Sequence, residues 1–294
     1  MNLEEFHKAN YKKLMIIPVV ILIISLFIIY NHYSKTNDFF DRDVSLKGGI
    51  SATISTDKSI DLNKLQDILA SKFKDASVRK LSEFGSDKQT GIVVEIPEIE
   101  EEELKSALEE QFQIKLTPEI YSVEITGSSL GSSFYSQMLK AMLFAFILMA
   151  LSVFIIFRSP IPCLAVVFAA FTDIVATIAI VNLLEIKVSS AGISAFLLLI
   201  GYSVDTDILQ TTKMMKRIYG TLHQRIISAM KTGLTMTVTS TAAVLVGYFL
   251  TNSEAIKQMF FIILIGLLID PLTTYLMNTG LIKWYMERKH GQTS

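Results

Sequence analysis

The sequence predicts a polytopic α-helical membrane protein with six transmembrane helices and one exported α+β domain. Of its 294 residues, 51% are hydrophobic and 19% are charged, which is too apolar for an ordinary soluble domain. Six segments are long and apolar enough to cross a bilayer, since about 20 apolar residues at 1.5 Å rise per residue suffice. A long polar stretch between the first two segments predicts the exported domain.

The first apolar segment, residues 14–31, follows a charged N-terminal tail, residues 1–13, that contains Lys8, Lys12 and Lys13. Such a start is typical of a secretory signal. Its uninterrupted length and the absence of a small-residue cleavage site after it instead predict an uncleaved membrane anchor.

The polar stretch, residues 32–136, predicts a ferredoxin-like βαββαβ sandwich followed by a connector. Alternating and helical apolar patterns indicate the elements in this order: strand 46–55, helix 61–73, strands 78–84 and 91–97, helix 101–113 and strand 121–125. Asp61 and the acidic run 98–103 suit helix N-termini, and we prefer this interpretation of the acidic run to a cation site. The sequence TGSSLGSSF that follows predicts a flexible connector, which is either a hinge or a plain linker.

The remaining apolar segments predict a five-helix bundle, residues 137–283, and a C-terminal tail, residues 284–294. Its spans are expected at residues 138–157, 161–184, 191–210, 234–250 and 259–281. Lysine and arginine residues cluster in both tails and in the loops that six crossings place on the same side. The positive-inside rule therefore predicts a multi-pass protein of the cytoplasmic membrane, with both termini cytoplasmic and the α+β domain outside.

Two carboxylates, Asp205 and Asp207, lie inside the fourth span. Even lower estimates for a carboxylate at bilayer depth are about 2.5–3.5 kcal/mol, so both must face protein, water or a counter-charge. At roughly 100° per residue they point to nearly opposite sides of the helix. Asp205 shares a face with Gly201, and Asp207 lies on the face of Ser203.

Polar residues in the other spans suggest a proton or ion relay around Asp205. Asp173 lies near the middle of the third span, and Thr235 and Thr239 share a helical face in the fifth, where they could hydrogen-bond carboxylates or water. Lys231 opens the fifth span and is either a partner of Asp205 or a snorkelling anchor. We expect Asp205 and Asp173 to titrate, the alternative being permanent polar contacts between helices.

The other two intramembrane acids favour structural interpretations. Asp270 precedes Pro271, which lacks an N–H and kinks the helix, so its carboxylate is expected to satisfy freed backbone donors. Asp207 is expected to pack between helices rather than act as a second relay acid.

Enzymatic chemistry has no recognisable motif in this sequence. It has no Walker loop, no GxGxxG motif after a strand and no HExxH, and its one cysteine, Cys163, allows no intramolecular disulfide or zinc cluster. A net charge of −1 argues against nucleic-acid binding. We therefore expect a non-enzymatic protein without cofactor or metal, driven by a partner or an ion gradient.

With these residues in view, the chain resembles the SecF family of protein-export membrane proteins, in the SecD/SecF branch of the resistance-nodulation-division superfamily. The resemblance rests on VSLKGGI with Gly48 and Gly49, TGSSLG, FTD, KTGLTMTVTS, and GYSVDTDIL with Gly201, Tyr202 and Ser203. It implies an accessory subunit that works with a SecD-like partner and the Sec translocon on secretory polypeptides, using a proton gradient.

An extra acid at Asp207 and two further departures from the bacterial pattern resemble archaeal rather than bacterial members of this family. Thr206 stands where bacterial members carry the fourth-span acid, whereas Asp205 matches the SecD version, and Lys231 replaces an arginine. Two alternatives stay open. One is a small-molecule or lipid exporter of the same superfamily, although such exporters have two repeats with large exported domains. The other is a scaffold whose carboxylates never titrate.

Overall fold

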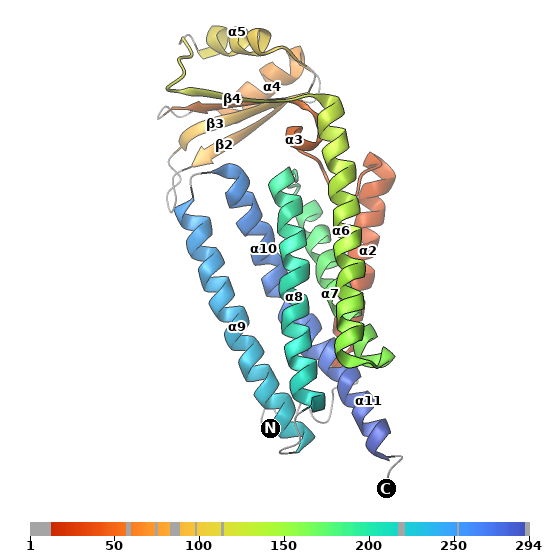
Figure 1. The fold of residues 1–294 in the computed structure, drawn as a ribbon. Coiled ribbons are helices and arrows are strands. Elements are labelled where there is room, and N and C mark those ends of the chain that lie inside the picture. Colours follow the sequence, from red (N-terminus) through yellow and green to blue (C-terminus); the bar gives the residue numbers. More distant parts are fainter. Residues whose placement is uncertain are drawn as a thin grey trace. The chain divides into compact units, whose positions relative to one another are not determined.

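The computed structural model (Figure 1) describes residues 13–56, 60–73, 76–82, 89–97, 99–112, 115–216, 221–251 and 253–291. The chain divides into a helical unit, Met1–Asp41 with Lys140–Ser294, and an α+β unit, Arg42–Leu139. Some of the predicted features lie outside the described residues: Lys8, Lys12, Glu98, the end of the strand predicted at 78–84 and residue 113.

Among the described residues, six helices are long and apolar enough to cross a membrane, which confirms the predicted polytopic architecture. The helices are α2 (Ile16–Thr36), α6 (Ser128–Phe157), α7 (Pro160–Leu183), α8 (Ser190–Lys216), α9 (Leu222–Leu250) and α10 (Glu254–Leu272), the last continued by the π-helix η1 (Thr273–Asn278) and by α11 (Thr279–Gly291). Their ends follow local signals. Pro160 begins α7, and a capping box between Thr221 and Gln224 begins α9.

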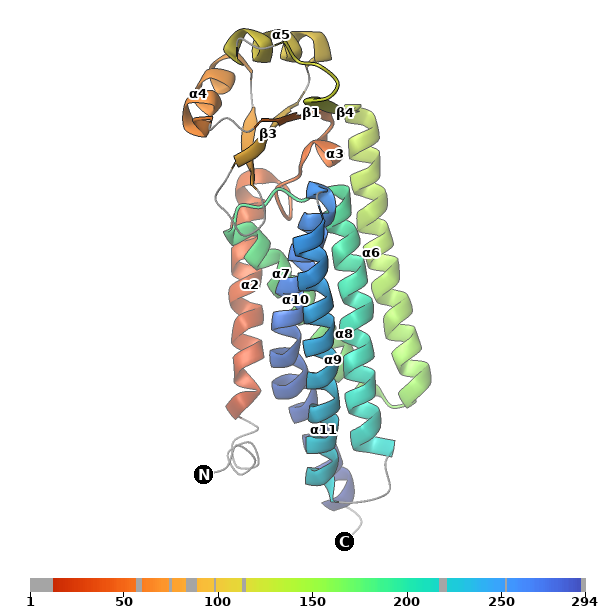
Figure 2. The same ribbon diagram turned by 90° about the vertical axis from the view of Figure 1, so that its left-hand side faces the viewer.

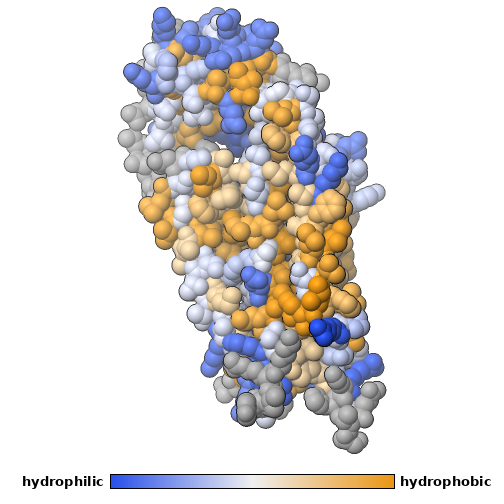
Figure 3. Space-filling model, viewed as in Figure 1, coloured by the Kyte–Doolittle hydropathy of each residue, from blue (hydrophilic) through white to orange (hydrophobic). Residues whose placement is uncertain are grey.

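The helical unit has an inner and an outer set of helices. Helix α7 is the most buried, and α8 packs against α7, α9 and α10. Helices α2, α6 and α9 instead expose most of their apolar residues. Apolar side chains dominate the surface of this unit in Figure 3. Such a surface suits contact with lipid, because exposure of so many apolar side chains to water would be unfavourable.

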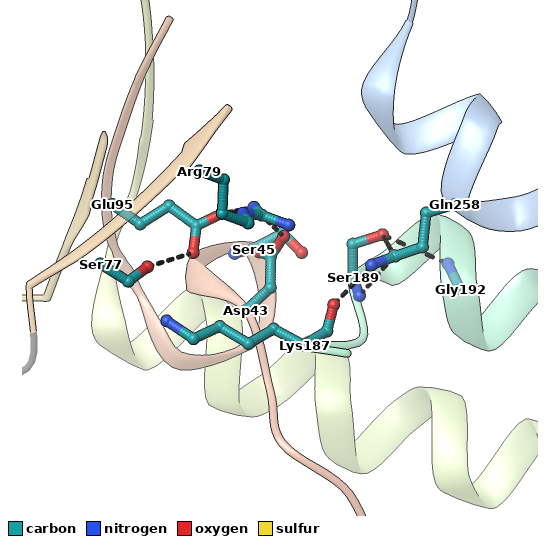
Figure 4. A network of polar contacts seen from close by, with 9 residues as sticks. All are labelled: Asp43, Ser45, Ser77, Arg79, Glu95, Lys187, Ser189, Gly192 and Gln258. Atoms are coloured by element: carbon teal, nitrogen blue, oxygen red, sulfur yellow. Dashed lines mark hydrogen bonds and ion pairs between the residues drawn. The ribbon is translucent and has the colours of Figure 1, made fainter. Parts of the chain in front are cut away.

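A glutamine side chain fixes the start of α8 within the helical unit (Figure 4). Gln258 of α10 accepts hydrogen bonds from the Ser189 backbone N–H at 2.9 Å and from its hydroxyl at 2.5 Å. The amide group of Gln258 also donates to the Lys187 carbonyl. One side chain thereby satisfies polar groups at a helix N-terminus, which an isolated helix leaves unpaired.

The α+β unit contains the βαββαβ order that the sequence predicts. Its elements are a short helix α3 (Val44–Lys47), β1 (Gly49–Ser55), α4 (Leu62–Lys72), β2 (Ser77–Ser82), β3 (Gln89–Ile96), α5 (Glu101–Phe112) and β4 (Tyr121–Thr126). The strands form one sheet in the order β2-β3-β1-β4, and all neighbours are antiparallel. In β1, one of the two inner strands, Ile50 lies opposite Ile96 of β3 on one side and Ile125 of β4 on the other.

Helices α4 and α5 cover one face of this sheet (Figure 2). Alternate residues of β1, Ile50, Ala52 and Ile54, point into the core between them and are almost fully buried. Leu65 and Leu69 of α4 meet them from the helix layer, at the i, i+4 spacing of one helical face. The strand and helix periods in the sequence thus account for the two layers.

On the sheet of the α+β unit, one buried carboxylate is paired with an arginine (Figure 4). Glu95 of β3 is 3% exposed, receives an ion pair from Arg79 of β2, and accepts a hydrogen bond from the Ser77 hydroxyl at 3.2 Å. Arg79 also lies 4.0 Å from Asp43. These partners offset the cost of burying the charge.

The first predicted strand begins three residues late. Residues 44–47 form α3 instead, because the Asp43 carboxylate caps it by accepting from the Ser45 N–H at 2.6 Å. Gly48 (φ 89°) and Gly49 (φ 130°) then turn the chain into β1, in a backbone region that side chains disfavour.

The predicted flexible connector is wrong in its local structure. Helix α6 begins at Ser128, so almost all of TGSSLGSSF is helical. Gly131 serves close packing rather than flexibility, because a Cβ there would lie 2.7 Å from the Gly48 nitrogen.

Candidate functional site

Three aspartates from three helices form a buried carboxyl cluster in the helical unit: Asp173 of α7, Asp207 of α8 and Asp270 of α10. All three side chains are fully buried. Asp173 has a hydroxyl donor on each oxygen, Ser203 of α8 at 2.5 Å and Thr273 of η1 at 2.5 Å. The cluster therefore joins the inner helices through side-chain hydrogen bonds.

Asp207 and Asp270 share a donor from η1. The Thr274 hydroxyl lies 2.9 Å from Asp207 Oδ1 and 3.3 Å from Asp270 Oδ1. Asn278 adds a second hydrogen bond to Asp207 Oδ1 at 2.8 Å. The second oxygens, Asp207 Oδ2 and Asp270 Oδ2, are buried and have no hydrogen-bond partner among the described residues.

The carboxyl cluster has no cationic partner among the residues that the structure describes. The ion pairs of the described chain involve other carboxylates, such as Asp41, Glu95 and Glu287. Three ionised carboxylates in one buried, low-dielectric site would repel one another strongly. Burial of three carboxyl groups together therefore disfavours the state in which all three are ionised.

A break in helical geometry gives the cluster its donors. Pro271 lies inside α10 and offers no N–H to the preceding turn, and the six residues of η1 follow with π-helical hydrogen bonds. The Thr279 N–H bonds the Thr274 carbonyl five residues back. This wide turn presents Thr273, Thr274 and Asn278 to the two other helices.

Of the residues predicted to form a relay with Asp205, only Asp173 belongs to the carboxyl cluster. Asp205, Lys231, Thr235 and Thr239 are all exposed on α8 and α9. The hydroxyls of Thr235 and Thr239 bond carbonyls of their own helix, each at 2.9 Å, rather than a carboxylate. The helix rotation that separates Asp205 from Asp207 puts Asp207 inside, so the structure does not bring Asp205 to Asp173.

The fourth-span motif divides between the two faces of α8. Ser203 points inward and donates to Asp173, whereas Gly201 is exposed and a Cβ there would meet nothing within 4 Å. Tyr202 is half-buried, and within the part of the chain that the structure describes its hydroxyl has no hydrogen-bond partner. Gly48 and Gly49 belong to the α+β unit and take no part in the cluster.

Sequence reasoning missed the donors Thr273, Thr274 and Asn278. Their signal was the spacing from Asp270, namely i+3, i+4 and i+8, which keeps polar residues on one face of an otherwise apolar span. A polar face in a span predicts contact with protein rather than lipid.

Comparison with known proteins identifies the kind of protein that carries this cluster. Residues 105–288 match the family model "Protein export membrane protein SecD/SecF, C-terminal". The chain belongs to the SecD/SecF family. The matched residues include all three aspartates of the carboxyl cluster and every membrane helix except α2.

SecF proteins of archaea resemble the chain over nearly its whole length. The SecF of Methanothermobacter thermautotrophicus is 35% identical, with 95% of this chain and 93% of the relative covered. The SecF of Pyrococcus furiosus is 32% identical, with 96% and 93% covered. This is a protein-export family, as the resemblance of the sequence implied.

A solved SecDF structure has the same fold. The crystal structure of SecDF from Thermus thermophilus, described as a translocon-associated membrane protein, superposes with a TM-score of 0.77 at 16% identity. The match covers 98% of this chain but only 40% of the SecDF chain. The fold of SecDF therefore accounts for 98% of this chain, while the larger part of SecDF lies outside the match.

Proposed function

We propose that the chain is an accessory subunit of the Sec protein-export machinery that promotes translocation or release of secretory polypeptides across the cytoplasmic membrane. The observation that carries this proposal is the match to archaeal SecF proteins over 93% of their length. A folded α+β unit attached to a membrane-embedded helical unit suits work on polypeptides at one membrane surface.

Deleting the gene tests this role. Export and release of a secreted reporter, followed by pulse labelling, should slow in the deletion strain and recover when the intact chain is supplied. Unimpaired export and release, with both steps resolved, would contradict the proposal.

The carboxyl cluster supports coupling to an ion gradient, and we take protons to be the ion. Carboxylates buried without a cation bind protons, and one charge moved across 100 mV is worth about 2.3 kcal/mol. This energy is comparable to the lower estimates for placing an acid at such depth. The energy of the gradient is therefore of the same order as the cost of a change in charge at one cluster member.

Asp173→Asn and Asp207→Asn test this coupling, because each keeps the size of the side chain and removes its titration. Both variants should lose gradient-dependent export in membrane vesicles, and the double variant should be little worse, since the sites act together. Imposed proton and sodium gradients distinguish the two ions. Full gradient-dependent export by both variants, at matched protein level, would rule the cluster out.

Exposed polar side chains support a SecD-like partner in the membrane. Asp205, Lys231 and Thr235 lie on the outside of membrane-spanning helices, where contact with lipid would be costly. Gly201 leaves room on the same side of α8 for close approach of another helix. The SecDF neighbour is more than twice as long, as expected if this chain corresponds to one part of a two-part assembly.

Purification from native membranes in mild detergent tests the partner. A SecD-like chain should copurify with the intact chain, and the Sec translocon is expected to associate with this pair. Recovery of a monomer alone, under conditions that preserve the translocon, would exclude a stable pair.

For orientation, we propose cytoplasmic termini and an extracytoplasmic α+β unit, because basic residues such as Arg158, Arg225 and Arg288 fall on the same side of six crossings. Protease added to intact cell-wall-free cells should cut loops of the α+β unit and spare an epitope tag on the C-terminus. The reverse pattern would overturn the orientation.

A further inference from the structure

Thr274 has one hydroxyl hydrogen and two carboxylate acceptors. Its Oγ1 lies 2.9 Å from Asp207 Oδ1 and 3.3 Å from Asp270 Oδ1, both within hydrogen-bond distance. A hydroxyl donates a single hydrogen. It therefore cannot make a full hydrogen bond to both carboxylates at once.

The three carboxyl groups differ in how many donors they have. Asp173 accepts one hydroxyl on each oxygen, and Asp207 also accepts from Asn278 at 2.8 Å. Asp270 Oδ1 accepts the longer contact from Thr274, and the Ser203 hydroxyl, which donates to Asp173, also lies within reach of Asp270. Because donors stabilise a charged carboxylate, the Thr274 hydroxyl matters most to the balance of charge between Asp207 and Asp270.

Two carboxyl oxygens of the cluster accept no hydrogen bond from the described residues. Asp207 Oδ2 and Asp270 Oδ2 are buried and have no hydrogen-bond partner within the described residues, so each is a position for an acidic proton. These are the oxygens that Thr274 does not contact. A proton on one carboxyl and the Thr274 hydrogen bond on the other satisfy the pair without conflict.

We propose that Thr274 is a positioning residue that passes its hydroxyl hydrogen between Asp207 and Asp270 as one proton moves between these two carboxyl groups. With the proton on Asp270 Oδ2, the hydroxyl donates to ionised Asp207. When that O–H bond breaks and one forms at Asp207 Oδ2, the hydroxyl turns to ionised Asp270. The pair keeps one negative charge throughout.

The backbone of η1 can stay fixed while the Thr274 hydroxyl rotates from one carboxylate to the other. The Thr274 carbonyl is held by the Thr279 N–H and by the Thr279 hydroxyl at 2.9 Å. The hydrogen of the Thr274 hydroxyl can rotate about its C–O bond while this backbone stays fixed. The hydroxyl can thus change its acceptor without movement of a helix.

Other titratable groups face the same site from each inner helix. Asp173 comes from α7, Tyr202 and Asp207 from α8, and Asp270 and Tyr275 from α10 and η1. Helix α9 contributes Gly233 against the Tyr275 hydroxyl. The carboxyl groups can be distinguished from the phenols experimentally by the infrared carbonyl band that only a protonated carboxyl group shows.

This proposal rests on proton coupling through the cluster, and infrared titration of the full chain, purified in its native complex, tests it separately from export. Asp207→Asn and Asp270→Asn assign the carbonyl band. Thr274→Val keeps the shape but removes the hydroxyl. The midpoint at which the band disappears should move up by about one pH unit, because the ionised pair loses a hydrogen bond to a charge. Thr274→Ser should restore it.

Thr172→Val is the matched control, since Thr172 is buried beside Asp173 but donates to the Phe168 carbonyl at 2.8 Å. Its midpoint should equal that of the natural chain. If Thr274→Val fails to fold, Thr274→Ala provides the same measurement. An unchanged midpoint in the folded Thr274 variant, or an equal shift in Thr172→Val, would overturn the proposal. Export that ignores the gradient in the natural chain would instead overturn the proposed coupling, with the titration unaffected.

Discussion

Gly48 and Gly131 lie in contact through their backbones, and a methyl group on Gly131 would come within 2.7 Å of the Gly48 nitrogen. Gly48 itself has a φ of 89°, which favours glycine. The glycine pair before β1 and the glycine in the first turns of α6 are thus two sides of one packing contact within the α+β unit.

Gly131→Ala should therefore destabilise the α+β unit by about 1–3 kcal/mol, because backbone atoms cannot yield to the added methyl group as a flexible side chain can. Gly127→Ala is the matched control, since a Cβ at Gly127 meets nothing within 4 Å. Amide hydrogen exchange of β1 and β4 in the full chain measures both. Equal effects of the two changes would favour a flexible connector over a packing contact.

Gly233 and Tyr275 make a comparable contact in the helical unit. A Cβ on Gly233 of α9 would overlap the Tyr275 hydroxyl oxygen. Gly233→Ala should lower the melting temperature, with a cost of about 1–3 kcal/mol. Tyr275→Phe removes the obstructing oxygen, so the same alanine should cost less than half as much in that background. Additive effects of the two changes would contradict this contact.

Tyr121 makes the stability of the α+β unit sensitive to high pH. Burial, aided by the nearby negative charges of Glu101 and Glu109, raises the pKa of Tyr121 from 10.0 to about 12. A raised pKa means that the folded chain holds this proton more tightly, so its contribution to stability is complete below pH 10 and is lost as the pH rises through 12. Tyr121→Phe should remove that loss, as measured by unfolding between pH 9 and 12. Identical pH profiles would exclude Tyr121 as the cause.

Substitution of Asp205 distinguishes an effect on partner binding from an effect on the carboxyl cluster. Because Asp205 is exposed, Asp205→Asn should change the free energy of unfolding of the isolated chain by less than about 1 kcal/mol. Gradient-dependent export should nevertheless fall sharply if its charge faces a partner in the membrane. Gly201→Leu fills the open side of the same helix and should weaken recovery of the SecD-like chain. Full export and assembly in both variants would place no partner on this face.

The apolar patterns of the sequence predicted the architecture well. Six apolar segments became six long helices, and the order of strand and helix periods became the four-stranded sheet with α4 and α5. These patterns work because burial from water or in lipid depends directly on which positions are apolar. The predicted start of β1 was wrong because it is set by the Asp43 cap and by the positive φ of Gly48. These local backbone effects leave no mark in the apolar pattern.

The candidate site could be predicted only in part. The helix period correctly placed Asp205 and Asp207 on different faces, but it does not say which face turns inward. The inward face is set by packing of α8 against α7 and η1. Ser203 of α8 donates to Asp173 of α7, and Thr274 of η1 donates to Asp207 of α8. The π-helix was also hidden, since Pro271 indicates a kink without fixing the hydrogen-bonding pattern that follows.

The π-helical turn η1 also concerns chain length. A π turn holds an extra residue relative to an α-helical turn, so the segment between α10 and α11 behaves as an insertion that both flanking helices have absorbed. Removing one residue from Thr273–Asn278 would return this segment to the α-helical repeat while α10 and α11 kept their places. The span would still cross the bilayer, but the deleted position would no longer reach a carboxylate. In this helix, an alignment gap of one residue would mark a change of chemistry rather than a change of fold.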